Sequence, residues 1–253
     1  MASLHSQRRF RHNPRRLRLG LVLLALVAMA CAFWPRAVAA AKIVAVRIGT
    51  ARTIEERVGE FGEVVRARLA PNFAAAGVSW PAQRLRLVAF KAERRLEVWA
   101  FDSARGWRLL RTYPMTAASG VLGPKLREGD EQVPEGLYPI ESLNPNSLFH
   151  LALRVGYPND FDRARALEDG RSKLGGDIMI HGGDRSVGCL ALGDAAAEDL
   201  FVMTALAGVS NTDAILAPCD LRANCDPLPP DTAPPWTLSL WAEIRRSLDE
   251  LGR

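Results

Sequence analysis

Histidine and cysteine are scarce in this chain, which has four of each among its 253 residues. After residue 41 there remain two histidines and three cysteines: His150, His181, Cys189, Cys219 and Cys225. Because a structural zinc site normally takes four ligands, mostly Cys and His, this supply argues against a zinc framework. We therefore expect neither a metal nor another cofactor.

Acidic residues are missing from one end of the chain. Residues 1–41 hold seven arginines and no Asp or Glu, whereas the remainder has 26 basic and 28 acidic residues. The net charge of +5 therefore comes from the N-terminal segment and does not indicate a nucleic-acid-binding protein. After residue 41 there is also no internal repeat, and no stretch is long and apolar enough to span a bilayer.

The N-terminal segment has the layout of a secretory signal peptide. A basic region precedes the apolar run 19–33, and two small-x-small cleavage sites follow at 37–39 and 39–41. We expect residues 1–41 to direct a periplasmic or secreted domain formed by residues 42–253. An uncleaved anchor in the inner membrane is the alternative, and a twin-arginine signal or a lipidated Cys31 fits its motif poorly.

Several regular elements can be predicted from the pattern. Thr53 can cap a helix that reaches about Leu69, with Pro71 and Gly77 ending it. Residues 121–160 are rich in turn signals, which indicates an irregular β-rich domain whose loops carry the site. The other expected elements are strands at 42–48, 85–90, 95–101, 107–113, 137–140, 149–155 and 178–180, and helices at 160–168, 195–206 (capped by Asp194) and 238–251.

The segment 178–194 carries the chemistry. The apolar run 178–180 is followed directly by His181 and Gly182. Gly188 and Cys189 directly precede a second apolar stretch, residues 190–192. A free thiol titrates near ~8.5, so it needs a base to be a good nucleophile at neutral pH, and histidine suits that role. Glycines let the backbone turn tightly and bring amides close to a reacting carbonyl. The segment predicts a Cys/His acyl-transfer site.

The supporting groups are less fully specified. We expect the amides of Gly188 and Cys189 to form an oxyanion hole, supported by Gly182 and Ser186. The group that orients the imidazole stays open between a backbone carbonyl, Ser186 and Asp184.

Two other interpretations of this segment were weighed. Ser186 as nucleophile would need the esterase pattern Gly-x-Ser-x-Gly, but Asp184 stands where the first glycine belongs. A zinc site at His181, Asp184 and Cys189 would lack a fourth ligand. We expect His150, on a predicted strand, to be structural.

An ordered set of short motifs runs from Gly123 to Asp194 and resembles the YkuD-type L,D-transpeptidases, within them the YafK-like branch. The matching pieces are Gly123-Pro124-Lys125, Glu128-Gly129-Asp130, Pro134-Glu135-Gly136-Leu137-Tyr138, Leu143-Asn144-Pro145-Asn146-Ser147, Gly156-Tyr157-Pro158-Asn159, Gly176-Asp177-Ile178-Met179-Ile180-His181-Gly182 and Ser186-Val187-Gly188-Cys189-Leu190-Ala191-Leu192.

The resemblance implies an α+β fold, mainly β, with flanking helices and a motif region at 83–207. It also implies that Cys189 and His181 act on peptidoglycan stem peptides in cell-wall biogenesis and cell shape. Members attack the L-centre carbonyl of meso-diaminopimelate in a tetrapeptide and release D-alanine. The acyl group passes to an amine, or to water in an L,D-carboxypeptidase or amidase.

Two departures from the common family pattern leave the acceptor open. Many members have Ser-His-Gly-Cys, whereas this chain has Val187 in place of the histidine. Many also have Arg or Asn shortly after the cysteine, where this chain has residues 190–192 as Leu-Ala-Leu. Both departures are typical of the YafK-like branch, which is associated with hydrolysis as well as transfer, including release of a lipoprotein attached to peptidoglycan.

Residues in or beside the motif loops are expected to line the substrate cleft. They are Tyr138, Asn146, Arg154, Tyr157 and Gly183. A stem peptide with a free carboxylate would bind favourably at a cationic or amide-rich rim.

Cys219 and Cys225 lie six residues apart in a turn-rich loop and are expected to form a disulfide, which leaves Cys189 free. Two reduced surface thiols are the alternative.

A function of another class, a non-catalytic peptidoglycan-binding module, would not need the pair formed by Cys189 and His181.

Overall fold

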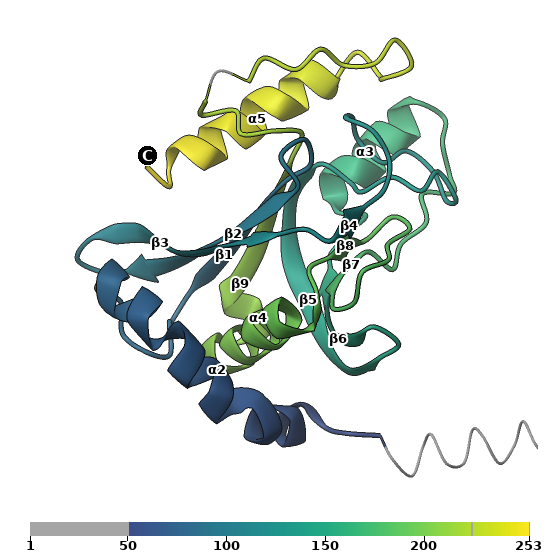
Figure 1. The fold of residues 1–253 in the computed structure, drawn as a ribbon. Coiled ribbons are helices and arrows are strands. Elements are labelled where there is room, and N and C mark those ends of the chain that lie inside the picture. Colours follow the sequence, from purple (N-terminus) through teal and green to yellow (C-terminus); the bar gives the residue numbers. More distant parts are fainter. Residues whose placement is uncertain (1–50, 224, 253) are drawn as a thin grey trace, which may run out of the picture. The chain divides into compact units, whose positions relative to one another are not determined.

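The computed structural model describes residues 51–223 and 225–252 (Figure 1). The expected signal peptide or anchor at 1–41 and the strand at 42–48 lie outside these residues. Helices are α2 (Ile54–Ala76), α3 (Asp160–Glu168), α4 (Asp194–Ala207) and α5 (Thr237–Asp249), with a 3₁₀ turn at Val209–Asn211. Strands are β1 (Leu85–Phe90), β2 (Arg95–Asp102), β3 (Gly106–Pro114), β4 (Ala117–Ala118), β5 (Gly136–Ser147), β6 (His150–Val155), β7 (Met179–His181), β8 (Leu190–Ala191) and β9 (Thr212–Ala217).

The strands form one mixed sheet in the order β3-β2-β1-β9-β5-β6-β7-β8-β4. The pairs β1–β9 and β7–β8 are parallel, and the other pairs are antiparallel. Helices lie against this sheet on both sides (Figure 1). The expected α+β class, mainly β with flanking helices, is confirmed. Within the described residues, every helix is too short or too polar to cross a membrane.

Two apolar clusters bury the faces of the sheet. The larger includes α2 and α4 through Leu69, Phe73 and Phe201, whereas the smaller packs α5 through Trp241 and Ile244. Strand β1 is therefore almost entirely buried, and apart from Arg86 its side chains are apolar on both faces.

Helix α2 is longer than the sequence suggests. Its start is a capping box, in which the Glu56 amide donates to Thr53 Oγ1 over 3.1 Å and the Thr53 amide donates to Glu56 Oε2 over 2.9 Å. Pro71 does not end the helix, contrary to expectation. Phe73 is buried beyond it, and the packing of that turn offsets the missing amide. The helix ends at Gly77, whose φ of 68° is left-handed.

Two other expectations about strands are wrong. Residues 144–147, which carry one of the turn signals of the region 121–160, instead continue β5 and pair with β6. Register shifts near Ile140 and Asn144 accommodate Pro145 in that strand. Strand β9 was not expected, although it lies at the centre of the sheet between β1 and β5. Both of its neighbours are distant in sequence, so only tertiary pairing identifies it.

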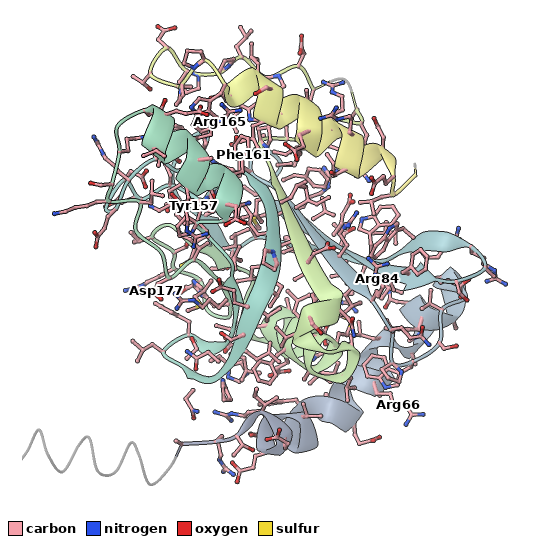
Figure 2. All side chains as sticks on the ribbon, turned by 180° about the vertical axis from the view of Figure 1, so that it is seen from behind. Arg66, Arg84, Tyr157, Phe161, Arg165 and Asp177 are labelled. Atoms are coloured by element: carbon pink, nitrogen blue, oxygen red, sulfur yellow. A yellow bond between two sulfur atoms is a disulfide. The ribbon has the colours of Figure 1, made fainter. Side chains whose placement is uncertain are left out.

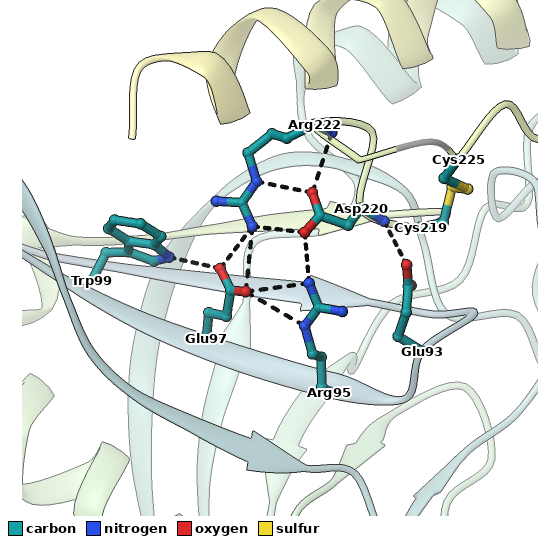
Figure 3. Close-up of polar contacts among 8 residues, drawn as sticks. All are labelled: Glu93, Arg95, Glu97, Trp99, Cys219, Asp220, Arg222 and Cys225. Carbon is teal, nitrogen blue, oxygen red and sulfur yellow. Dashed lines mark hydrogen bonds and ion pairs between the residues drawn. A yellow bond between two sulfur atoms is a disulfide. The ribbon is translucent and has the colours of Figure 1, made fainter. Parts of the chain in front are cut away.

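Cys219 and Cys225 form a disulfide, with their Cα atoms 6.4 Å apart, in agreement with the expected pairing. The segment they close is tied to β2 by a polar network (Figure 3). Arg222 contacts both Asp220 and Glu97, at 2.8 and 3.0 Å respectively. The network and the disulfide together hold the chain that follows β9 before it enters α5. Among the described cysteines, this pairing leaves Cys189 as the free thiol.

Candidate active site

The predicted nucleophile and base lie on neighbouring parallel strands. In the register of β7 and β8, Ile180 pairs with Leu190 and His181 with Ala191. Cys189 directly precedes β8 and so lies opposite Met179. Since residues two apart on a strand share a face, the side chains of His181 and Cys189 emerge on the same side of the sheet.

The thiol of Cys189 is partly buried and contacts the backbone of the loop before β7. The Met179 amide donates to Sγ over 3.4 Å, and Sγ lies 3.6 Å from the Asp177 carbonyl oxygen. Burial raises the pKa of the Cys189 thiol, which the Met179 amide partly opposes. Within residues 51–223 and 225–252, no hydrogen bond joins this thiol to the imidazole. The raised pKa indicates that the Cys189 side chain is a neutral thiol at neutral pH.

The imidazole of His181 is buried and fixed by the backbone. Its Nδ1 atom lies 2.6 Å from the carbonyl oxygen of Gly182. A carbonyl only accepts hydrogen bonds, so this contact assigns the proton to Nδ1 and leaves the lone pair on Nε2. The ring of Phe149 stacks on the imidazole with centroids 4.7 Å apart. Burial lowers the pKa of His181, so the ring is neutral and able to act as a base.

Both amides expected in the oxyanion hole already have partners. The Gly188 amide donates to Ser119 Oγ over 2.6 Å, and the Cys189 amide donates to Ser186 Oγ over 3.1 Å. The hydroxyl of Ser186 in turn donates to the Cys189 carbonyl oxygen. Ser186 thus closes the turn that presents the thiol and does not contact the imidazole. The sequence suggested that both amides are free to donate to a substrate oxygen, but in this structure each already donates to a serine hydroxyl.

Ser119 is a site residue that sequence reasoning missed. Its hydroxyl donates to the Glu131 carbonyl oxygen over 2.7 Å and accepts from the Gly188 amide. Ser119 therefore connects residues 182–189, the candidate catalytic loop, to a second loop that contains Glu131. That second loop is braced by Asp130, whose carboxylate accepts from the amides of Leu126 and Gln132 and pairs with Lys125. Ser119 lies far from the catalytic motif in sequence, and no motif of its own marks it.

The two glycines after His181 are required for different reasons, Gly182 by packing and Gly183 by its backbone conformation. A Cβ atom on Gly182 would lie 2.6 Å from Asp194 Oδ1 and 2.8 Å from the Phe149 carbonyl oxygen. Gly183 has a φ of 70°, and its amide donates to the same Asp194 oxygen over 2.8 Å. Asp194 therefore holds this turn, whereas the N-cap of α4 is Gly193, contrary to expectation.

The residues expected to line the cleft are not all brought together. Tyr138 and Tyr157 are only 2% and 3% exposed, and their hydroxyls donate to the carbonyls of Glu135 and Lys125. These tyrosines therefore do not line an open cleft. The Asn146 side chain bonds to the Arg52 backbone in both directions, at 2.8 Å each, and anchors the start of α2. Tyr138 and Tyr157 are buried because the motifs that contain them also contribute side chains to the core.

Arg154 lies on the same face of the sheet as Cys189, with β7 between them. It pairs with Met179 across β6 and β7, and the Met179 amide contacts the thiol. His150 is structural, as expected: its Nε2 lies 3.1 Å from Glu198 Oε1, and its ring packs edge-on against Phe61. Across the part of the chain that the structure describes, no three His, Cys, Asp or Glu side chains are grouped as metal ligands would be.

Known proteins with related sequences share this region of the chain. The family described as the L,D-transpeptidase catalytic domain, YkuD, matches residues 84–210. YafK, a candidate L,D-transpeptidase of Escherichia coli (strain K12), is 37% identical over 114 residues, which cover 44% of this chain and 44% of YafK. The matched part thus spans less than half of that relative.

Solved structures that resemble part of this chain have lower identity. The helical cell shape determining protein Pgp2 from Campylobacter jejuni is 22% identical, with a TM-score of 0.44 over 54% of this chain and 48% of Pgp2. Bdellovibrio bacteriovorus Bd1075 is 18% identical, with a TM-score of 0.41 over 69% of this chain and 56% of its own. The family match covers half of the chain, and the chain belongs to the YkuD family of L,D-transpeptidase catalytic domains.

Proposed function

We propose that this protein is a cysteine-dependent L,D-transpeptidase that remodels peptidoglycan. Its donor substrate is a tetrapeptide stem, attacked at the L-centre carbonyl of meso-diaminopimelate. The observation that carries the proposal is the position of a free thiol, Cys189, and a neutral histidine, His181, on one face of neighbouring strands in a domain of this family. The imidazole is held in the tautomer that a general base needs.

The first half-reaction follows from these two groups. Nε2 of His181 takes the proton of the Cys189 thiol as sulfur attacks the carbonyl carbon. The tetrahedral intermediate collapses, the bond to D-alanine breaks, and the imidazolium returns the proton to the leaving amine. Both partners are neutral at rest, so proton transfer accompanies attack. The hydrogen bond between them forms only in the substrate complex, as is common for catalytic contacts.

The developing oxyanion needs backbone donors. For the Gly188 amide to serve, its hydrogen bond must pass from Ser119 to the substrate oxygen. The Cys189 amide is held by Ser186 within the same turn and would have to exchange in the same way. Substrate binding in this proposal therefore includes a small rearrangement between the catalytic loop and the loop that carries Ser119.

The second half-reaction decides the product. An amine acceptor re-forms a peptide bond, whereas water releases a tripeptide. The hydrolytic alternative is an L,D-carboxypeptidase or amidase, for example one that releases a peptidoglycan-attached lipoprotein. Both routes share the acyl-enzyme on Cys189, so the same site supports either.

We also propose that residues 42–253 form the catalytic domain and that residues 1–41 direct it to the periplasm or the exterior. If the segment is not cleaved, it anchors the protein to the inner membrane. Sequencing the N-terminus of the protein recovered from cell fractions distinguishes the two forms.

The experiment is mass spectrometry of muropeptides incubated with the full-length protein, alongside a Cys189→Ala variant. Loss of D-alanine with new cross-linked dimers would establish a transpeptidase. Tripeptides alone, or release of a diaminopimelate-linked protein, would establish a hydrolase. If the folded protein changes nothing and its thiol is not acylated by a carbapenem, the proposal is wrong and a binding module remains.

A further inference from the structure

Arg154 lies on the same face of the sheet as the nucleophile. It pairs directly with Met179 across β6 and β7, and the register of β7 and β8 places Met179 opposite Cys189. Directly paired residues share a face of the sheet. Two strand steps of roughly 4.8 Å each place the Arg154 and Cys189 backbones about 10 Å apart. A long side chain bound at Cys189 can span that separation.

The guanidinium of Arg154 is held between two carboxylates. Its Nε donates to Glu141 Oε2 over 3.1 Å, and its Nη1 pairs with Asp177 Oδ1. The side chains of Glu141 and Asp177 are 47% and 79% exposed, so the cluster is open to a ligand from solvent. The cluster therefore presents one cation and two anions at the surface.

Asp177 connects this cluster to the thiol. Its backbone carbonyl oxygen is 3.6 Å from Cys189 Sγ, and its φ of 56° is left-handed, which is unusual for a residue with a side chain. Asp177 lies below Tyr157 in the view of Figure 2, in the loop before β7. The conformation directs its carboxylate toward Arg154 while its carbonyl faces the nucleophile.

We infer that Arg154 and Asp177 bind the D-centre of diaminopimelate and so select the stem peptide. This inference rests on the proposed function, in which the L-centre carbonyl of the same residue reacts at Cys189. The D-centre lies at the far end of that side chain and carries a free carboxylate and a free ammonium. The carboxylate takes the place of Asp177 on the guanidinium, and Asp177 accepts from the ammonium, while Glu141 stays on Nε.

The charges distinguish this ligand from its close relatives. A guanidinium fork binds a carboxylate through parallel charge-assisted hydrogen bonds, and Asp177 supplies the complementary anion for the ammonium. A lysine at the same position of the stem offers an ammonium but no carboxylate, which leaves Arg154 without a new partner. Because an exposed ion pair contributes about 0–1 kcal/mol to stability, opening the Arg154–Asp177 pair costs little.

The test uses the full-length protein and three synthetic tetrapeptide stems. These carry meso-diaminopimelate, its D-centre carboxamide, or L-lysine at the third position. We expect kcat/KM for D-alanine release to be about 3- to 5-fold higher for the first stem, the effect of an exposed ion pair that contributes up to about 1 kcal/mol. In Arg154→Gln the three stems should become nearly equal, because the discriminating group is gone.

Controls separate recognition from damage. Arg163→Gln removes another exposed arginine, one that pairs with Asp160 on α3, and should keep the full preference. Thermal unfolding of Arg154→Gln checks that the variant is folded, and its midpoint should stay near that of the wild type because both ion pairs of Arg154 are exposed.

The outcomes also separate the inference from the proposed function. Equal wild-type rates on the three stems, or a preference that survives in Arg154→Gln, would overturn the inference and leave the proposed function standing. Failure of the wild-type protein to release D-alanine from any stem would overturn both.

Discussion

The Nδ1 atom of His181 lies 2.6 Å from the carbonyl oxygen of the next residue, Gly182. In the proposed mechanism, this backbone carbonyl orients the imidazole, a role that the sequence left open. A carboxylate in that place would raise the pKa of the imidazole, whereas a neutral carbonyl does so much less. The imidazole is therefore held in position without being made more basic.

The pH dependence of acylation follows from these environments. Burial lowers the pKa of His181 from its ordinary value of 6.5 and raises that of Cys189 above 9.0. Acylation requires a neutral imidazole as the base and starts from a neutral thiol. Because His181 is protonated only below pH 6.5, kcat/KM should stay flat through pH 7 and decline on the acid side of 6.5. A profile of carbapenem acylation against pH checks this, and an acid limb centred above 7 would contradict it.

The same shift of His181 affects stability. The unfolded chain takes up the histidine proton near pH 6.5, whereas the folded chain takes it up at a lower pH. The unfolded state thus binds more protons in that window, and the free energy of unfolding should fall as the pH drops below 6.5. Urea titrations at pH 5.5 and 7.5 on the wild type and His181→Gln measure the effect. The variant should lose this contribution to the pH dependence.

Replacing either catalytic group should abolish acyl transfer without unfolding the protein. Cys189→Ala removes the nucleophile, and we expect a loss of at least about 10³-fold in D-alanine release. His181→Ala removes the base, and a loss of about 10²- to 10⁴-fold is expected. Rates come from mass spectrometry of the products, with thermal unfolding as the folding control. Full activity in Cys189→Ala would show that sulfur is not the nucleophile.

Ser119 should affect the rate more than the stability. In Ser119→Ala, the Gly188 amide and the Glu131 carbonyl lose their shared partner, and the catalytic loop is less well positioned. One net hydrogen bond is worth about 1 kcal/mol, so carbapenem acylation should slow about 5- to 10-fold. Ser119→Thr keeps the hydroxyl and should restore the rate, and Ser210→Ala on the 3₁₀ turn serves as the matched control. Faster acylation in Ser119→Ala would mean that the hydroxyl blocks the amide.

The buried pair of Lys91 and Glu135 should be important for stability. Glu135 is 1% exposed and accepts from the Trp241 indole over 2.6 Å, while its other oxygen lies 3.0 Å from Lys91 Nζ. The Lys91 side chain is itself buried, and this desolvation lowers the pKa of its ammonium. Glu135→Ala leaves that ammonium buried without its carboxylate and should cost about 3–5 kcal/mol in urea unfolding.

The control for this prediction is Glu60→Ala. Glu60 pairs with Arg57 on an exposed face of α2, where a loss within about 0.5 kcal/mol is expected. A similarly small loss in Glu135→Ala would show that the buried pair is not needed.

Local signals in the sequence were sufficient for much of the fold. The cap at Thr53, the hairpin of β1 and β2 and the helix at 160–168 each depend on neighbouring residues, and all three occur as expected. The ordered motifs also identified the family. These features share one physical basis, because their hydrogen bonds and side-chain spacing are decided within a few residues of chain.

Long-range packing decided what the sequence left undetermined. Packing keeps α2 helical beyond Pro71, places β9 between two strands that are distant in sequence, and buries Tyr138 within the core. It also brings Ser119 onto the Gly188 amide. The residues of the sequence specified a thiol, an imidazole and the glycines around them. Neighbouring residues, Gly182 and Ser186, fix the tautomer of the imidazole and hold the Cys189 amide. The partner of the Gly188 amide, by contrast, depends on a contact between two segments that meet only in the folded domain, because Ser119 is distant in sequence.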